Sequence, residues 1–326
     1  MLVIGLQGSP QKNGNTSFLL SSFMKEADRI GACTKIIEIA EKNILPCKGC
    51  GYCEKNGSCF IKDDMSGEIY QLLWEADMVV IATPIFFYNA TAQLKAVIDR
   101  SQALWSRKYR LKLSDPGRKT RKGFLLSVGA TKGLNLFEGL HLTTKYFFDA
   151  LGANYNGSLT YKCIENKGDM KKHLTVLKDV KKEAAKHLEH LASRKKIMFI
   201  CRENACRSQM AAAFTRYLAG DKIEAISCGS NPADTINPDM AEVMEEMGID
   251  MAYQKPESIK DALEKIKPDM IISMGCGDAC PFIQNIEKED WSLPDPSGQS
   301  KTFMKNICNN IEKRVNDLIK RVSATS

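Results

Sequence analysis

Residues 78–83 read MVVIAT and residues 196–200 read KIMFI, and these two short runs decide the fold class. Both runs are almost continuously apolar, so neither strand keeps a face for water. A strand buried on both faces is typical of a parallel sheet covered by helices. Around residues 78–83, strand patterns at 2–6, 34–39, 123–128 and 154–160 alternate with helix patterns at 17–30, 65–76, 90–106, 136–151 and 169–191. This alternation predicts a doubly wound α/β domain with five strands.

A second alternation begins at residues 196–200. It predicts strands at 223–228 and 270–273 and helices at 209–218, 239–247, 258–267 and 300–322. The charged stretch at residues 190–196 (HLASRKK) separates the two patterns, which sets the domain boundary near Ser193. We therefore expect two three-layer doubly wound parallel-sheet domains, at residues 1–193 and 194–326.

The composition excludes several classes of protein. The 326 residues are 44% hydrophobic and 26% charged, and no uncharged apolar run approaches the ~18 residues of a membrane span. The opening MLVIGLQGSP has neither the positive region nor the apolar stretch of a signal peptide, so we expect a cytoplasmic protein. Residues 107–122 are rich in Lys and Arg, but no nucleic-acid motif accompanies them. We interpret them as a solvated loop and expect neither nucleic acid nor membrane as a partner.

Two loops of the first domain suit a phosphorylated flat ligand. GSPQKNGNT at residues 8–16 precedes a helix, whose N-terminal N–H groups favour a phosphate monoester, and it lacks the Gly-Lys-Ser/Thr of a nucleoside-triphosphate loop. A second loop follows residues 78–83 at their carboxyl end, where doubly wound folds place ligands. There Tyr88 and its neighbours can frame a ring. The candidate cofactor-binding residues are Ser9, Gln11, Asn15, Thr16, Ser17, Pro84, Phe86, Phe87 and Asn89.

Four cysteines fall within thirteen residues, between the second strand and the next helix. They are Cys47, Cys50, Cys53 and Cys59. In a reducing cytosol, clustered cysteines indicate metal or redox chemistry. The tight spacing is close to that of iron–sulfur ligand runs, whereas zinc sites usually consist of two separated pairs. A 4Fe–4S cluster, free or redox-active thiols, and zinc all remain open. Four isolated cysteines, Cys33, Cys163, Cys228 and Cys308, are expected to be buried as small apolar residues.

CRENACRS at residues 201–208 lies between a buried strand and a helix. The helix N-terminus and Arg207 both favour the thiolate of Cys201. The N–H groups of the loop and the guanidinium fork suit a tetrahedral oxyanion. One loop can therefore hold both the thiolate nucleophile and the oxyanion that it attacks. The expected oxyanion-binding residues are Glu203, Asn204, Ala205, Cys206, Arg207 and Ser208.

Residues 1–190 resemble the flavodoxin-like NAD(P)H-dependent FMN reductases. The motifs GSPQKNGNT, PCKGCGYC…CFIKDDM and TPIFFYNATAQLKAVIDR occur in the family's order. The cysteine run resembles the cluster motif of iron–sulfur flavoproteins, which share this unit. The resemblance implies FMN, reduction by NAD(P)H, and a homodimer formed across the flavin site. Gln11 stands where relatives commonly carry Arg or Lys, which predicts weaker phosphate binding.

Residues 195–322 resemble the low-molecular-weight tyrosine phosphatases and the arsenate reductases built on their fold. The carrying motif is Cys-x5-Arg-Ser after a buried strand. MGCGDACP at residues 274–281 resembles the thiol loop of the reductases. DWSLPDPSG at residues 290–298 resembles the catalytic-acid loop, without the tyrosines that phosphatases place after Asp-Pro. These features favour a reductase. Ala212 replaces a Glu frequent in the family, so a cation site built on that Glu is not expected.

The reductase resemblance implies a mechanism for reducing arsenate. Arg207 and the loop bind arsenate, the Cys201 thiolate attacks arsenic, and Asp295 protonates the departing oxygen. Cys276 then attacks Cys201, arsenite leaves, and Cys280 resolves the pair to a Cys276–Cys280 disulfide. Cys206, which shares the loop, is a second candidate partner.

The electrons that reset the disulfide have two candidate sources. NAD(P)H can supply them through FMN in the first domain, or thioredoxin or a small thiol can supply them from outside. Two other functions stay open. One is a tyrosine phosphatase fused to a flavoprotein, and the other is an iron–sulfur flavoprotein electron carrier or redox sensor.

Overall fold

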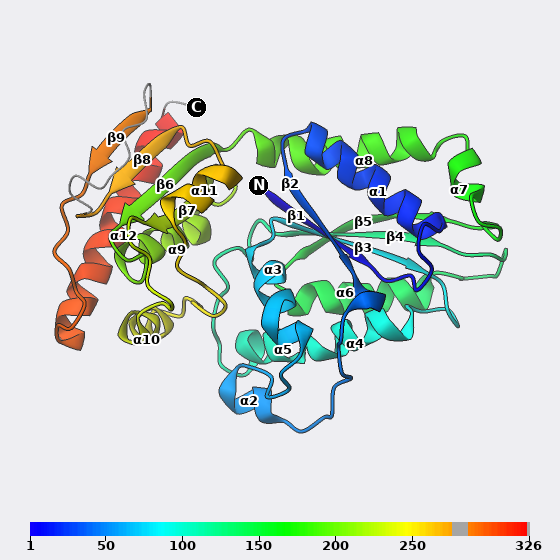
Figure 1. The fold of residues 1–326 in the computed structure, drawn as a ribbon, viewed down its shortest axis with the longest axis horizontal. Helices are drawn as coiled ribbons and strands as arrows, with labels where there is room; N and C mark the ends of the chain where they lie inside the picture. Colours follow the sequence, from blue (N-terminus) through cyan, green and yellow to red (C-terminus); the bar gives the residue numbers. More distant parts are fainter. Residues whose placement is uncertain (276–285, 325–326) are drawn as a thin grey trace. The chain divides into compact units, whose positions relative to one another are not determined.

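The computed structural model describes residues 1–275 and 286–324, which form two compact units (Figure 1). Unit 1 comprises Met1–Lys112 and Thr120–Ala192, and unit 2 comprises Leu113–Lys119 and Ser193–Ser326. The short segment Leu113–Lys119 joins unit 2 through a parallel bridge between Ser114 and Ile249. Ser114 donates its N–H to the Gly248 carbonyl at 2.8 Å. No local sequence pattern signals this long-range pairing.

Unit 1 is built on a parallel five-stranded sheet with the order β2-β1-β3-β4-β5. Its strands are β1 (Leu2–Gln7), β2 (Cys33–Glu38), β3 (Met78–Pro84), β4 (Lys122–Val128) and β5 (Asn154–Tyr161). Its α-helices are α1 (Asn15–Arg29), α2 (Tyr52–Asn56), α3 (Tyr70–Glu75), α4 (Ala92–Arg100), α5 (Gln102–Tyr109), α6 (Glu138–Ala150), α7 (Asp169–Lys172) and α8 (Val176–Ala192). A 3-10 turn, η1 (Ile39–Glu41), and a π-helical turn, η2 (Met65–Ile69), complete the unit. Helices α1 and α8 cover one face of the sheet, and α3 to α6 lie on the other (Figure 1).

Unit 2 is built on a smaller sheet with the order β7-β6-β8-β9, whose strand pairs are all parallel. The strands are β6 (Lys195–Cys201), β7 (Ile223–Gly229), β8 (Met270–Ser273) and β9 (Glu287–Asp290). The helices are α9 (Arg207–Ala219), α10 (Pro238–Glu246), α11 (Ile259–Lys265) and α12 (Lys301–Ala324). The two sheets confirm the prediction of two doubly wound parallel-sheet units.

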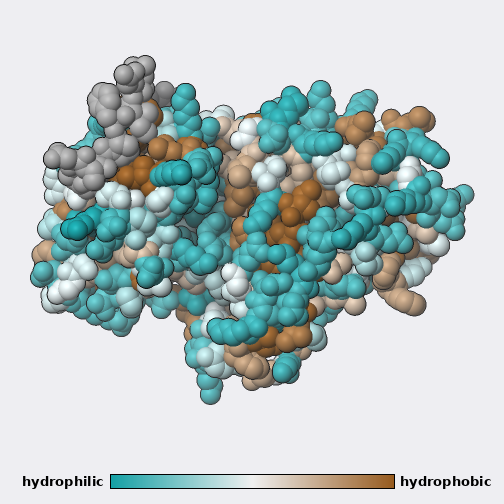
Figure 2. Space-filling model, viewed as in Figure 1, coloured by the Kyte–Doolittle hydropathy of each residue, from teal (hydrophilic) through white to brown (hydrophobic). Residues whose placement is uncertain are grey.

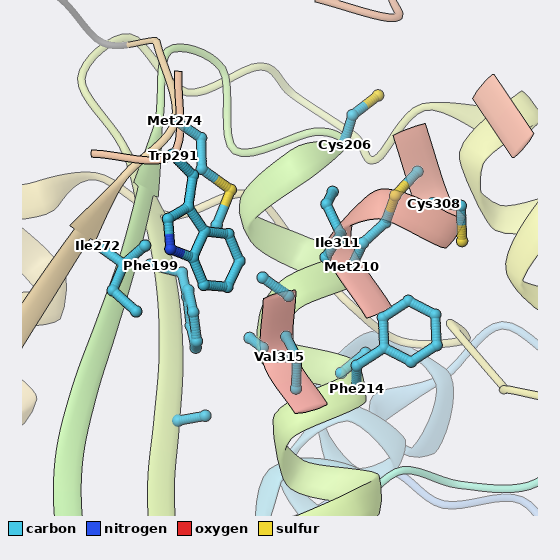
Figure 3. Close-up of a cluster of buried hydrophobic side chains, with 14 of the residues drawn as sticks. Phe199, Cys206, Met210, Phe214, Ile272, Met274, Trp291, Cys308, Ile311 and Val315 are labelled. Carbon is cyan, nitrogen blue, oxygen red and sulfur yellow. The ribbon is translucent and has the colours of Figure 1, made fainter. Parts of the chain in front are cut away.

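The core of unit 2 lies between its sheet and helices α9, α10 and α12. Figure 3 shows Phe199 and Ile272 from the sheet, Met210 from α9 and Ile311 from α12, all of them fully buried. A smaller cluster packs the opposite face against α11. Burial on both faces is what the apolar run at residues 196–200 requires, at roughly 1.5–3 kcal/mol for each large apolar side chain. The sequence of β6 therefore sets the three-layer arrangement.

The outer surface is mainly polar. On the face shown in Figure 2, hydrophilic side chains cover most of both units, with apolar residues in smaller patches between them. Within residues 1–275 and 286–324, no helix has the length and apolar character that a bilayer crossing would require. The apolar side chains are used to build the two cores.

Some element boundaries differ from the sequence patterns. The helix expected at 90–106 is two helices, α4 and α5, which meet at Ser101, whose hydroxyl donates to the Val97 carbonyl at 2.9 Å. Such back-bonding interrupts or bends a helix. The helix expected at 169–191 is likewise divided, because His173 adopts an extended conformation between α7 and α8. Strand β9 reads EKED and has no apolar signal, as suits an exposed edge strand.

Candidate active site

Each sheet reverses its strand order at one position, and the candidate residues follow the strands at these two positions. In unit 1 the reversal lies between β1 and β3, and in unit 2 it lies between β6 and β8. Ligands of doubly wound folds bind at the carboxyl ends of such strands. The loops at residues 8–16 and 84–91 leave β1 and β3, and the loop at residues 201–208 leaves β6.

The first two loops are tied to each other by the backbone of Gly8. Its N–H donates to the Ala82 carbonyl at 2.7 Å, and its carbonyl accepts the Thr91 hydroxyl at 2.5 Å. A Cβ at Gly8 would lie 2.8 Å from a methyl carbon of Leu94. This position therefore needs glycine so that the two candidate cofactor loops can approach closely.

The candidate residues of the first loop have different roles in the structure. Ser9 and Thr16 are buried, and Ser9 Oγ accepts the Gln11 N–H at 3.2 Å. Ser17 is partly buried and Gln11 is exposed. The Asn15 side chain is already engaged by the segment after β5. Its Oδ1 accepts the N–H groups of Gly168 and Met170, and its Nδ2 donates to the Asn166 carbonyl. Asn15 thus fixes a neighbouring loop.

Gln7, the last residue of β1, was not among the cofactor-binding residues predicted from the sequence. Its side chain is 1% exposed, and neither Nε2 nor Oε1 has a hydrogen-bond partner among the described residues. A buried amide without partners is destabilising by about 1–3 kcal/mol. It stands directly before Gly8, at the carboxyl edge of the sheet. An unsatisfied donor and acceptor at this point fit a polar, ring-bearing cofactor such as FMN.

The second loop forms a tight turn from Phe86 to Asn89. The two residues exchange backbone hydrogen bonds of 2.9 and 3.0 Å, while Phe87 and Tyr88 adopt positive φ angles of 47° and 62°. Phe87 is fully exposed, Phe86 is half exposed, and Pro84 is partly buried. Asn89 Nδ2 donates to the Thr143 hydroxyl at 3.0 Å. The strained turn holds aromatic side chains at the protein surface.

The four-cysteine segment is anchored at both ends by one buried ion pair. Arg100 and Asp63 are 0% and 1% exposed and lie 2.6 Å apart. The Arg100 guanidinium also donates to the carbonyls of Leu45 and Ile61, and Asp63 accepts the Leu45 N–H. Burial alone would raise the pKa of Asp63, but the bonds from Arg100 and Leu45 outweigh it and leave that pKa lowered. The sequence analysis missed Arg100, which only the tertiary structure brings to this segment.

The four thiols match a cluster in number and chemistry, but they are not arranged as one ligand set. Cys47 and Cys50 are exposed, while Cys53 and Cys59 are partly buried. Ser106 Oγ donates to Cys53 Sγ at 3.6 Å, and burial raises the pKa of the Cys53 thiol despite this bond. In the part of the chain that the structure describes, no three His, Cys, Asp or Glu side chains are placed to hold a metal ion.

The isolated cysteines divide into two pairs. Cys228 and Cys308 are buried as expected. Burial raises the pKa of each of these thiols to about 12. The expectation is wrong for Cys33 and Cys163, which are exposed. Cys33 opens the edge strand β2, and Cys163 has a positive φ of 60° in the loop after β5.

Cys201 ends β6 and lies at the bottom of the loop at residues 201–208. It is 2% exposed, and its Sγ accepts the Asn204 N–H at 3.2 Å. The Ser208 hydroxyl lies 3.0 Å from the same sulfur. Two protein donors can therefore face the sulfur, and both would favour a negative charge on it.

The backbone of this loop is oriented by a second segment. The carbonyls of Arg202, Glu203 and Ala205 accept N–H groups from Asn231, Ala233 and Asn237, at 2.8–3.0 Å. A Cβ at Gly229 would lie 2.7 Å from the Arg202 oxygen, so the loop packs directly on this glycine. These bonds fix the orientation of three peptide groups of the loop.

Arg207, the first residue of α9, connects the loop to the acid candidate. Its Nη2 lies 2.6 Å from Asp295 Oδ2, and its Nη1 donates to the Leu293 carbonyl at 2.8 Å. Arg207 is buried, whereas the Asp295 side chain is 49% exposed. A Cβ at Gly275, which follows β8, would lie 3.1 Å from Arg207 Nη1. Two loops that are distant in sequence thus meet at one guanidinium.

Cys206 is one of the thiols expected to react with Cys201 after arsenate has bound. Cys206 is 6% exposed, and burial together with the neighbouring Cys201 raises the pKa of its thiol to about 12. A protonated thiol is a poor nucleophile. Cys276 and Cys280 lie outside the described residues. Ala212 is buried in α9.

The structure joins Cys201 to Ser208 and Arg207 to Asp295 by contacts that the sequence could only suggest. Arg202 and Glu203 are exposed, while Ala205 and the other residues of the loop are buried. Gln209 was missed, although it directly follows the Arg-Ser pair. Its side chain donates to Asn204 Oδ1 at 3.2 Å. Its place one residue beyond the motif was the one signal available.

Two family models match the chain, one in each unit. Residues 1–134 match the family NADPH-dependent FMN reductase, and residues 196–326 match the family low molecular weight phosphotyrosine protein phosphatase. A glutaredoxin arsenate reductase from Synechocystis is 37% identical over 132 residues, which are 40% of this chain and 99% of that protein.

Further similarities cover both parts of the chain. An iron–sulfur flavoprotein from Archaeoglobus fulgidus is 41% identical over 100 residues, which are 31% of this chain and 45% of the relative. The chain thus spans about half the length of that flavoprotein. A solved thioredoxin-dependent arsenate reductase from Corynebacterium glutamicum is 30% identical, with 47% of this chain and 78% of that chain covered and a TM-score of 0.37.

Proposed function

This chain is an oxidoreductase whose residues 196–326 belong to the low molecular weight phosphotyrosine protein phosphatase family and whose residues 1–134 form an NADPH-dependent FMN reductase domain, and we propose that it reduces arsenate to arsenite at Cys201. Its electrons come from NAD(P)H through FMN held in unit 1. Arsenate reduction is supported by the match to an arsenate reductase, which covers nearly the whole length of that protein. The electron route is supported by the presence of both domains in one chain.

One observation carries the proposal for unit 2. The Cys201 sulfur lies within hydrogen-bond distance of the Asn204 N–H and the Ser208 hydroxyl, and Arg207 stands at the start of the adjoining helix. A helix N-terminus and a guanidinium attract a tetrahedral oxyanion such as arsenate. The same groups stabilise the thiolate that attacks it.

The reaction at unit 2 is a two-electron reduction. The Cys201 thiolate displaces one arsenate oxygen, which leaves as water after Asp295 has supplied a proton. Cys276 then attacks the Cys201 sulfur, and the electron pair of the As–S bond stays on arsenic, so arsenic(V) becomes arsenic(III). Arsenite leaves as the Cys201–Cys276 disulfide forms. Cys280 then displaces Cys201, so two thiols have lost two electrons in total.

The residues of unit 1 are proposed to hold FMN at the carboxyl edge of the sheet. Ser9 lies in the loop before α1 and Thr16 in the first turn of that helix. Gln7 offers an unsatisfied amide, and Phe86 and Phe87 lie on the adjoining turn. Bound FMN supplies hydride acceptance from NAD(P)H and the release of two electrons. Two electrons are the number needed to return one disulfide to two thiols.

The four-cysteine segment is proposed to hold a 4Fe–4S cluster. The spacing of Cys47, Cys50, Cys53 and Cys59 and the name of the iron–sulfur flavoprotein relatives support this. The test is to measure iron and acid-labile sulfide in anaerobically purified protein. Cys33→Ser removes an exposed cysteine outside the segment and, as the control, should leave both amounts unchanged. Metal-free protein after anaerobic reconstitution would favour redox-active thiols, and bound zinc without iron would favour the zinc alternative.

The deciding experiment measures arsenite release under anaerobic conditions. Purified protein receives FMN, arsenate and NADPH, then NADH in a second series, with no thioredoxin and no added thiol. We expect arsenite to form in step with nicotinamide oxidation and to be lost in Cys201→Ser but kept in Cys33→Ser. Activity that needs added dithiothreitol or thioredoxin would refute the internal electron route and leave arsenate reduction in place.

The family name also gives phosphatase activity as a second candidate. Hydrolysis of p-nitrophenyl phosphate that survives Cys276→Ser, without any arsenite release, would support it. Phosphate resembles arsenate in shape and charge, so we expect phosphate to compete with arsenate for the loop at residues 201–208. Phosphorus does not accept two electrons from a thiol, so only arsenate completes the redox cycle.

A further inference from the structure

The buried amide of Gln209 belongs to no step of the reaction above. Gln209 lies in the first turn of α9 and is 3% exposed. Its Nε2 donates to Asn204 Oδ1 at 3.2 Å and to the Lys255 carbonyl at 3.2 Å. A primary amide has two N–H bonds, and both are used here. The side chain is therefore fixed between two segments.

The first of these segments holds a strained residue. Asn204 has a φ of 51° and is fully buried. A left-handed conformation in a residue other than glycine persists where the surroundings over-determine it. The Asn204 side chain accepts the Glu257 N–H at 2.7 Å as well as the Gln209 amide. Two donors thus fix the direction of its Oδ1.

The orientation of the Asn204 amide affects the hydrogen bond that the Cys201 sulfur receives. With Oδ1 facing its two donors, Nδ2 donates to Ser208 Oγ at 2.8 Å. Because Ser208 Oγ accepts this bond, its own proton is available for Cys201 Sγ, 3.0 Å away. Hydrogen bonds in such a chain polarise one another. The series of hydrogen bonds that starts at Gln209 therefore ends with the Ser208 hydroxyl as a donor to the Cys201 sulfur.

The second segment reinforces the same arrangement. The bond from Gln209 to the Lys255 carbonyl joins α9 to the stretch that carries Glu257, two residues further along. Glu257 is the residue whose N–H reaches Asn204. Loss of the Gln209 amide would therefore remove one donor to Asn204 directly and loosen the segment that supplies the other.

We propose that Gln209 is a positioning residue for Cys201, which acts through Asn204 and Ser208 to keep a hydroxyl proton directed at the sulfur. The inference takes from the proposed function the role of Cys201 as the nucleophile. It adds a residue that touches neither the oxyanion nor the thiol. The readout is the reactivity of the Cys201 thiolate, which can be measured in the full chain without arsenate.

The test is alkylation of the full chain by iodoacetamide between pH 5 and pH 9. After digestion with trypsin, the peptide at residues 197–202 (IMFICR) contains Cys201 as its only cysteine, so mass spectrometry follows this thiol alone. The variants are Gln209→Met, which keeps the length and removes both donors, and Gln71→Met as a matched control. Gln71 donates to Glu75 within unit 1, whereas Cys201 belongs to unit 2.

We expect Gln209→Met to slow Cys201 alkylation at pH 7 by about three- to tenfold and to move the pH midpoint upward. The control should behave as the unchanged chain does. In a Ser208→Ala background, Gln209→Met should add little, because the chain of bonds is already cut. An unchanged midpoint in Gln209→Met, or effects that add fully with Ser208→Ala, would overturn the inference.

Two further measurements separate the possible failures. If Gln209→Met does not fold, as judged by circular dichroism, Gln209→Leu also removes both N–H donors without adding a charge, and the same slowing is expected. Absence of arsenite release from the unchanged chain, with NAD(P)H and also with added dithiothreitol or thioredoxin, would refute the proposed function. The alkylation profiles would still decide the role of Gln209, because they do not depend on arsenate.

Discussion

The Arg207 guanidinium donates to the Asp295 carboxylate at 2.6 Å, although the two residues are 88 positions apart in the chain. The Arg207 side chain is nearly buried, and Asp295 is half exposed at the rim. The residue expected to bind the oxyanion therefore also holds the residue expected to protonate its departing oxygen. Any movement of Asp295 is limited by its ion pair with Arg207.

Replacing Asp295 by Asn should separate catalysis from thiol reactivity. The amide keeps the size of the side chain but supplies no acidic proton, so arsenate turnover should fall by about 10²- to 10⁴-fold. Single-turnover arsenite release measures the effect, and Cys201 alkylation at pH 7 should change little. Asp317→Asn, which removes an exposed partner of Lys320, is the control. Unchanged turnover in Asp295→Asn would exclude Asp295 as the acid.

Cys206 should be dispensable for arsenate reduction. Its pKa is raised to about 12, first by burial and then by Cys201, so the thiol is protonated near neutral pH. Cys206→Ser should therefore keep most of the turnover, while Cys201→Ser abolishes it. In trypsin digests, the peptide at residues 203–207 reports Cys206 separately, and its alkylation at pH 7 should be far slower than that of Cys201. Loss of arsenite release in a folded Cys206→Ser protein would contradict this assignment.

Arg100→Leu should destabilise unit 1 strongly. The substitution leaves Asp63 buried without its charged partner, which costs about 3–5 kcal/mol in the free energy of unfolding. Lys95→Met removes an exposed ion pair from the same helix and should cost about 0.3–0.5 kcal/mol. Urea unfolding of both variants provides the comparison. Equal, small losses would show that Asp63 is satisfied by its other donors.

The same ion pair predicts a pH dependence for the four-cysteine segment. The pKa of Asp63 is lowered in the folded chain, so its contribution is fully present above the ordinary aspartate value of about 4 and is lost as the pH falls through the folded value. The segment should therefore stay anchored at neutral pH and loosen below about pH 4. Hydrogen exchange at Leu45, whose N–H bonds to Asp63, should accelerate there relative to exchange in β1. Leu45 protection that stays constant down to pH 2 would contradict it.

Gln7→Met should affect stability and flavin binding in opposite directions. The apolar side chain relieves a buried amide that has no partner among the described residues, so flavin-free protein should gain about 1–3 kcal/mol in the free energy of unfolding. FMN should bind more weakly, because a donor and an acceptor have been removed from the edge of β1. Urea unfolding and quenching of FMN fluorescence measure the two effects. A less stable apoprotein with unchanged FMN affinity would refute this role for Gln7.

Much of the fold could be predicted because its signals are local. The continuous apolar runs of β3 and β6 required burial on both faces, and the intervening helix patterns then required parallel strands. Strand β9 could not be predicted in this way. Its charged residues pair with β8 at the sheet edge, where side-chain burial imposes no pattern. The break at Ser101 depended on a side-chain hydrogen bond that competes with the helix.

By itself, the sequence determined the two parallel-sheet units and the order of their chemical motifs. It did so because periodicity, loop composition and the Cys-x5-Arg-Ser spacing are properties of neighbouring residues. The tertiary structure alone decided which distant groups support these motifs: Arg100 at the ends of the cysteine segment, Asp295 on Arg207, and Gln209 behind Asn204. A hydrogen bond or ion pair between distant residues depends on how strands and helices pack, and no local pattern of the chain encodes that distance.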